Sequence, residues 1–274
     1  MRRRVGLVTA VDRANGVVSG VVEGVPVTAT YISGRDEPYP LGEAMFSGGG
    51  TTPWTCLHAI GHRERLFRDD FVSVTAGNRY GDTDWSLGQS DGTASAAGAT
   101  GVASGAVRIT APNAGTVSVI GMLEKDASSM VAPSGNNAYL LSARMRPIDD
   151  YTNTFPTLGW GLFADVATSP YATVSGGGSS GFAITTCYDN TTTADEVLPL
   201  GIFATGTWNI YEIMWASDFV AGWVDGNGPY VLTTGVPTTS MRPGVGALTS
   251  ALTQYRVEVD WVEGSIVTTD YTPR

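Results

Sequence analysis

Three carboxyl side chains stand close together near the end of the chain: Glu258, Asp260 and Glu263, at positions i, i+2 and i+5. Retaining hydrolysis of a glycosidic bond uses two carboxyl groups about 5–5.5 Å apart, one as nucleophile and one as acid/base. A strand with one bulge can bring the sixth residue of such a run onto the face of the first and third. In a regular strand, however, Glu258 and Asp260 share one face and Glu263 takes the other. The regular pattern therefore predicts that the two glutamates are kept apart.

Other reactive side chains are few. His58 and His62 are the only histidines, and Cys56 lies close to them. Their spacing suits a metal site on a helix, but Trp54–Ile60 has strand character, so no zinc site is expected. Because both histidines precede the larger part of the chain, no Ser-His-Asp set is predicted, and no phosphate loop or dinucleotide fingerprint occurs.

Charge and cysteine usage exclude several further classes. A formal net charge of −10 leaves no concentrated basic face, so no nucleic acid is expected as a partner. No run approaches the roughly 20 apolar residues of a membrane helix, and the amino-terminal run Val5–Val11 indicates a strand rather than a signal peptide. Cys56 and Cys187 fall in different predicted domains, which argues against a structural disulfide.

The first sixty residues predict a small barrel. Short Val-rich or alternating runs are separated by Gly- and Asp-rich turns, which is hairpin chemistry. The predicted strands are 5–11, 17–23, 25–31, 41–46 and 54–60. Five short strands favour a closed barrel of the OB or SH3-like kind, with no pocket of substrate size. The polar run Gly61–Arg65 marks a boundary, so we assign residues 1–61 to a docking barrel and 62–274 to a second domain.

The second domain predicts a two-sheet sandwich, because it contains more strands than one twisted sheet accommodates. The Gly-rich segments 88–105 and 175–181 are interpreted as loops. The predicted strands are 66–72, 83–87, 106–110, 117–123, 138–146, 158–165, 181–188, 208–215, 219–224, 241–247 and 255–262. The fold class is therefore all-β, with almost no helix.

The stretch Thr207–Gly226 resembles the concanavalin A-like lectin/glucanase family, in which a W-x-x-Y-x-I-x-W strand is followed by a hairpin and a strand ending in V-D-G. Tyr211, Ile213 and Trp215 alternate onto one face, as the resemblance requires. The first and last strands of the family are similar to Phe67–Phe71 and Val257–Glu263. The resemblance implies a jelly-roll sandwich over about residues 66–267.

The same resemblance bears on the three carboxyl residues. Glu258, Asp260 and Glu263 match the E-x-D-x-x-E pattern of family 16 glucanases, but the catalytic strand of those enzymes lies in the middle of the domain. Here the pattern ends 11 residues before the carboxyl terminus, where the final strand of the family carries a V-D-W-V pattern of its own. The prediction is that the chain is not an enzyme and has no catalytic residues.

An amino-terminal barrel fused to such a jelly roll, in a chain with a single lysine, resembles minor tail and fibre proteins of phages that infect actinobacteria. The resemblance implies a homo-oligomeric virion component, assembled in the host cytoplasm and located in the tail. Its barrel would bind other tail proteins, and its lectin-like sandwich would be displayed to a host cell-surface glycan. Two alternatives stay open: a glycoside hydrolase of the laminarinase or family 16 type, and a purely structural decoration module.

Sugar sites stack aromatic rings on pyranose faces and fix hydroxyls with carboxylates and amides. Tyr188, Asp189, Asn190 and Trp223 lie at predicted strand ends beside loops and are the candidate carbohydrate-binding group. Four other tryptophans alternate with aliphatic residues and are predicted to pack between the sheets: Trp160, Trp208, Trp215 and Trp261. No cofactor is expected, although a structural calcium ion stays open, with Asp260 as the residue that the resemblance carries over.

Overall fold

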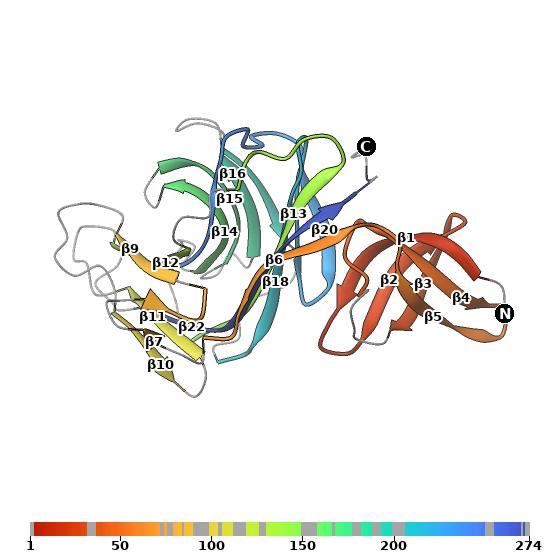
Figure 1. The fold of residues 1–274 in the computed structure, drawn as a ribbon, viewed down its shortest axis with the longest axis horizontal. Coiled ribbons are helices and arrows are strands. Elements are labelled where there is room, and N and C mark those ends of the chain that lie inside the picture. Colours follow the sequence, from red (N-terminus) through yellow and green to blue (C-terminus); the bar gives the residue numbers. More distant parts are fainter. Residues whose placement is uncertain are drawn as a thin grey trace.

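The chain folds as a small β-barrel followed by a β-sandwich in the computed structural model (Figure 1). The structure describes residues 3–31, 37–71, 74–75, 79–83, 85–89, 99–103, 106–111, 119–125, 130–148, 158–165, 168–176, 182–187, 193–198, 206–249, 255–269 and 271. Within these ranges every regular element is a strand, which confirms the predicted all-β class. A search of the same residues for a helix that could span a membrane finds none.

The barrel closes through five strands in the order β1-β2-β3-β5-β4, with β3 and β5 parallel and every other pair antiparallel. A tight turn joins β2 to β3, and both of its residues, Glu23 and Gly24, have positive φ, as a two-residue hairpin requires. Val8, Val18 and Phe46 fill the interior. This is the Greek-key barrel of the OB type. The strands are β1 (Arg3–Asp12), β2 (Val17–Val22), β3 (Val25–Tyr31), β4 (Glu43–Gly49) and β5 (Thr52–Ala59).

One sheet of the sandwich lies against the barrel and is called the barrel-side sheet here. Its order is β10-β11-β22-β13-β18-β19-β20, and β6, which leaves the barrel, pairs with the end of β22 that β11 does not reach (Figure 1). The strands are β6 (Arg63–Asp69), β10 (Ala99–Ala103), β11 (Ala106–Ala111), β13 (Asn137–Pro147), β18 (Asn209–Trp215), β19 (Val220–Val224), β20 (Asn227–Leu232) and β22 (Tyr255–Thr268).

The other sheet, called the far sheet here, has the order β17-β16-β15-β14-β21-β12-β9-β8-β7. Between the two sheets lies an apolar core that includes Trp85, Trp160 and Trp215, all without solvent exposure. The strands are β7 (Val74–Thr75), β8 (Arg79–Tyr80), β9 (Trp85–Gln89), β12 (Val119–Lys125), β14 (Leu158–Asp165), β15 (Thr168–Gly176), β16 (Phe182–Cys187), β17 (Thr193–Leu198) and β21 (Arg242–Thr249).

The predicted strands and the observed ones agree best where apolar and polar residues alternate clearly. β14 has the predicted bounds, whereas β10 lies inside the Gly-rich segment 88–105 that was interpreted as a loop. The strands β15, β17 and β20 were not predicted, since their sequences are short, Thr-rich or Gly-rich. The proposed division at residues 61 and 62 falls between β5 and β6 and stays a prediction.

A second apolar core joins the barrel to the outer face of the barrel-side sheet. Ala10, Tyr39 and Leu41 of the barrel region pack against residues such as Leu140 and Trp223, all of them buried. Trp223 has no solvent exposure, and its indole Nε1 donates a hydrogen bond to the carbonyl oxygen of Thr9 at 3.0 Å. The outer face of the sheet is therefore closed by the barrel at this end.

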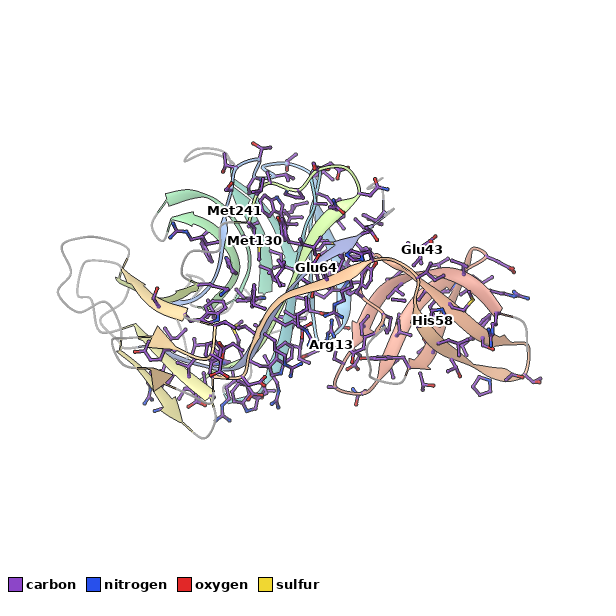
Figure 2. All side chains as sticks on the ribbon, viewed as in Figure 1. Arg13, Glu43, His58, Glu64, Met130 and Met241 are labelled. Atoms are coloured by element: carbon purple, nitrogen blue, oxygen red, sulfur yellow. The ribbon has the colours of Figure 1, made fainter. Side chains whose placement is uncertain are left out.

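Ionic and polar contacts surround that core. Arg13, which lies at the boundary between barrel and sandwich in Figure 2, donates to Glu37 at 3.1 Å and to Glu212 at 3.2 Å. Burial alone would lower the pKa of Arg13, but the charges of Glu212, Glu263 and Glu37 outweigh it and raise that pKa. The Tyr39 hydroxyl donates to the carbonyl oxygen of Thr268 at 3.1 Å. These contacts fix the orientation of the barrel on the sheet.

Replacing Trp223 by alanine is expected to destabilise the whole protein by about 3–5 kcal/mol, because it removes a fully buried indole and leaves a cavity between barrel and sheet. Denaturant unfolding followed by intrinsic fluorescence and circular dichroism measures the change. Trp208→Ala is the matched control, since Trp208 is only half-buried and should cost clearly less. Equal losses for the two variants would contradict a junction built on Trp223.

Candidate functional site

The three carboxyl residues of β22 lie on the outer face of the barrel-side sheet. β22 pairs with β13 through a register shift in which Arg144 faces Trp261 and Met145 faces Val259, so that Asp260 is the extra residue of a bulge. Since Val257, Val259 and Val262 all belong to the core, Glu258 and Glu263 both face outward. The prediction that Glu263 takes the opposite face from Glu258 is therefore wrong.

Sharing a face does not make Glu258 and Glu263 a catalytic pair. Five residues of extended chain separate them, which is roughly 15 Å along the strand. Glycosidase carboxyl pairs lie about 5–10 Å apart. The two glutamates therefore cannot act on one glycosidic bond together.

Arginines hold all three carboxylates. Glu258 lies 2.6 Å from Arg108 and 2.6 Å from Arg146, and Asp260 lies 2.5 Å from Arg144. Glu263 pairs with Arg63, with Arg68 at 3.5 Å and with Arg65 at 3.6 Å.

The surroundings of Glu258 shift its pKa in the wrong direction for acid catalysis. Burial of Glu258 would raise its pKa, but hydrogen bonds and charges from Arg108 and Arg146 outweigh burial and lower the pKa from its ordinary value. A general acid requires the opposite shift. Glu258 is therefore a structural anion.

The structure also corrects one candidate sugar-binding residue and places the candidate calcium residue. Trp223 is buried at the junction, so the prediction that its ring is exposed for sugar stacking is wrong, because the barrel covers this part of the sheet. Tyr188, Asp189 and Asn190 lie outside the described residues. Asp260 pairs through Oδ2 with Arg144 at 2.5 Å, and the structural calcium ion stays a prediction. Within the described residues no group of three His, Cys, Asp or Glu side chains could hold a metal.

The tryptophans predicted to lie in the core divide into two pairs. Trp160 and Trp215 are buried between the sheets, as predicted. Trp208 and Trp261 are only half-buried and lie beside arginine side chains on the outer face of the barrel-side sheet, so the prediction is wrong for them. Alternation alone could not place them, because Trp208 precedes the first residue of β18 and Trp261 follows the bulge of β22.

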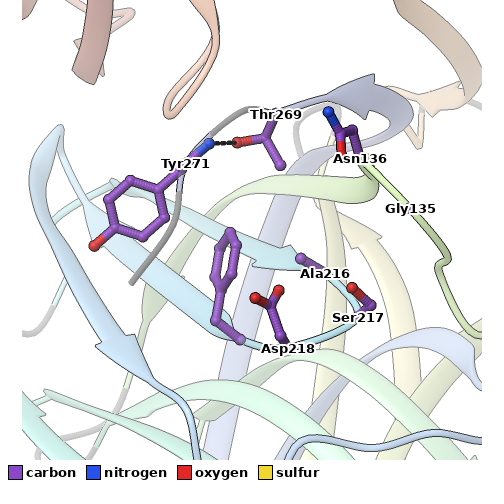
Figure 3. A pocket seen from close by; sticks show the side chains of 8 residues that line it. Gly135, Asn136, Ala216, Ser217, Asp218, Thr269 and Tyr271 are labelled. Carbon is purple, nitrogen blue, oxygen red and sulfur yellow. Dashed lines mark hydrogen bonds between the residues drawn. The ribbon is translucent and has the colours of Figure 1, made fainter. Parts of the chain in front are cut away.

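Two clefts occur near the junction and on the barrel. One, of about 310 Å³, lies between Asp218 and Ser217 on one side and Thr269 and Tyr271 on the other (Figure 3). The other, of about 540 Å³, lies on the barrel beside Trp54 and Arg4. Its size lies within the usual range for ligand pockets, so the prediction that the barrel has no pocket of substrate size is wrong.

The register of the far sheet can be followed across six strands. One row joins Glu124, Gly244, Gly161, Thr173, Thr185 and Asp195. Glu124 and Asp195 are five strand spacings apart, roughly 24 Å, which is too far for a glycosidase pair. In the middle of the row, Gly159 and Gly161 of β14 pair with Gly246 and Gly244 of β21. Four adjacent glycines leave this part of the sheet without side chains, and two of them, Gly161 and Gly244, are buried.

Replacing Glu258 by glutamine should lower stability at pH 7 by about 1–3 kcal/mol, because two arginines lose their shared anion. The folded pKa of Glu258 is lowered, so its contribution is present above the unfolded pKa of about 4.3 and is lost as the pH falls below it. Thermal unfolding between pH 3 and 7 measures both effects. The difference between the two proteins should shrink on acidification; a difference that grows below pH 4 would contradict the assigned shift.

Comparisons with known proteins support the fold. No family model and no curated protein matches the chain. Among solved structures, the endo-1,3-β-glucanase of Streptomyces sioyaensis has a TM-score of 0.54 at 12% identity, covering 75% of this chain and 97% of its own. A structure of endo-acting O-glycanases from members of the human gut microbiota has a TM-score of 0.54 at 13% identity, covering 76% and 100%. The catalytic domain of a laminarinase from Thermotoga petrophila has a TM-score of 0.50 at 13% identity, covering 77% and 100%.

These similarities change one prediction and leave others as they were. The three solved structures named above are enzymes that act on glycans, which contradicts the prediction, made for this fold, that the chain is not an enzyme. The predicted virion location, tail partners and homo-oligomer stay predictions. At 12–13% identity the likeness establishes the fold, and the second domain is a concanavalin A-like jelly-roll sandwich.

Proposed function

We propose that this protein is an endo-acting glycanase of the concanavalin A-like fold, and that it receives the polysaccharide on the outer face of the far sheet. The observation that carries the proposal is the occupation of the opposite face. On that face the barrel covers the sheet around the junction core. The carboxylates beyond it are paired with arginines, so none is free to act as an acid. A sandwich has two outer faces, so the far sheet is the face left for hydrolysis of a polymer.

The far sheet has backbone features that suit such a ligand. The paired glycines at 159, 161, 244 and 246 lie at the centre of the sheet, along the strands β14 and β21, and place no side chains there, although Gly161 and Gly244 are buried. A polysaccharide chain can lie close to a sheet where side chains are missing. The solved structures with the same fold are named as enzymes that act on the interior of glycan chains, which supports an endo-acting reaction here.

The acid residues of the far sheet are the ones to test. Glu124, Asp165 and Asp195 lie on β12, β14 and β17, and none of these strands touches the arginine-rich face of β22. Loss of a catalytic carboxyl lowers the rate by about 10²–10⁴-fold. An essential acid should therefore be found among the far-sheet residues and not among Glu258, Asp260 and Glu263.

The experiment is a chain-length assay. The intact protein is incubated with laminarin, mixed-linkage β-glucan and mucin O-glycans, and products are followed by size-exclusion chromatography and reducing-end release. We expect shorter oligosaccharides from at least one polymer, at the same rate with Glu258→Gln when both proteins are folded. No product from any polymer would contradict the proposal, and abolition by Glu258→Gln or Glu263→Gln would contradict the placement on the far sheet.

A further inference from the structure

Arginines and tryptophans gather on the part of the barrel-side sheet that the barrel does not cover. We call this surface the Arg–Trp face; it consists of Arg68, Arg108, Arg144, Arg146, Trp208 and Trp261. The guanidinium carbon of Arg68 lies 5.7 Å from the centre of the Trp261 ring, and those of Arg144 and Arg146 lie 5.0 and 4.6 Å from the Trp208 ring. These distances are those of cation–π contacts.

Strand register makes the surface continuous. Arg108, Glu258 and Arg146 form one row across β11, β22 and β13, and Arg144 lies opposite Trp261 in the neighbouring row. Each row crosses adjacent strands, so neighbouring side chains are about 5 Å apart. The rings and guanidiniums therefore form one platform rather than separate contacts.

The charged groups of this platform differ in how far they are exposed to solvent. The carboxylates of Glu258 and Glu263 are only 3% and 7% exposed, whereas the four arginine side chains of the face are 33–46% exposed. The two glutamates therefore lie beneath the guanidiniums, whereas Asp260 and Asp70 are 31% and 56% exposed beside their arginines. The four arginines of the face pair with four carboxylates, and Arg63 and Arg65 beside it add two further positive charges at Glu263.

The arginines also keep hydrogen-bonding capacity. A guanidinium has five N–H donors. Arg108 and Arg146 each use Nε and Nη2 on Glu258, and Arg144 uses Nη1 on Asp260, while these three side chains stay 33–40% exposed. The pairs with the buried carboxylates hold each guanidinium in place before a ligand arrives.

We propose that the Arg–Trp face binds an anionic polysaccharide, one whose sugars carry carboxylate or phosphate groups. Guanidiniums recognise both anions through paired hydrogen bonds, and indole rings stack on sugar faces. A nucleic acid fits less well, because a typical footprint neutralises about 6–10 phosphates, whereas the surplus beside this face is the two charges of Arg63 and Arg65. The site is distinct from the far sheet and does not depend on the proposed hydrolysis.

Affinity electrophoresis of the intact protein tests the site. Native gels contain polygalacturonate, a glycerol-phosphate wall polymer, laminarin as a neutral control, or single-stranded DNA. We expect retardation by at least one anionic polysaccharide, weakening with added salt, and none by laminarin through this face. Polygalacturonate and the phosphate polymer identify which anion is preferred.

Variants locate the binding. Arg144→Gln and Trp208→Ala should each weaken it by roughly tenfold, whereas Arg4→Gln, which removes an exposed arginine of the barrel, should leave it unchanged. Thermal unfolding confirms that each variant is folded; where Trp208→Ala is not, Arg144→Lys serves instead. Equal retardation of all variants, no retardation by either anionic polymer, or tighter binding of DNA than of both polymers would overturn the proposal.

Discussion

The packing of Trp223 against the barrel is the contact on which the rest of the molecule depends. A solvent-facing position of a sheet is here covered by Ala10, Tyr39 and Leu41, and the indole N–H is satisfied by a barrel carbonyl. Burial of so large a ring stabilises barrel and sandwich together. The barrel covers the outer face of the barrel-side sheet around Trp223, so only the uncovered part of that face and the far sheet can receive a ligand.

The arginine–carboxylate pairs extend the same constraint along β22. A buried carboxylate without a partner would cost several kcal/mol, and Glu258 and Glu263 each have two or more arginines. The arginine pairs explain why Glu258, Asp260 and Glu263 are not catalytic in this structure, although their spacing matches a catalytic pattern. The glutamates hold the arginine side chains in position. These arginines, together with Trp208 and Trp261, form the Arg–Trp face.

The sequence predicts the architecture better than the site. Alternation in Leu158–Asp165 and the hairpin chemistry of Glu23-Gly24 are local signals, and both the strand and the turn were found where expected. Which face of a strand meets solvent is decided by distant residues. Trp223 is at a position that alternation places outward, and only the docking of Tyr39 and Leu41 buries it. The bulge at Asp260 similarly moves Glu263 to the face of Glu258, and no residue type in the strand predicts the position of this bulge.

The central claim is that the barrel closes one side of the sandwich and that neutral glycans bind the other. Hydrogen–deuterium exchange with and without a neutral β-glucan oligosaccharide tests it directly. Our account predicts slower exchange in β14 and β21 on addition of the oligosaccharide, and unchanged exchange in β13, β18 and β22. Protection confined to β22 and β13, with none in the far sheet, would contradict it.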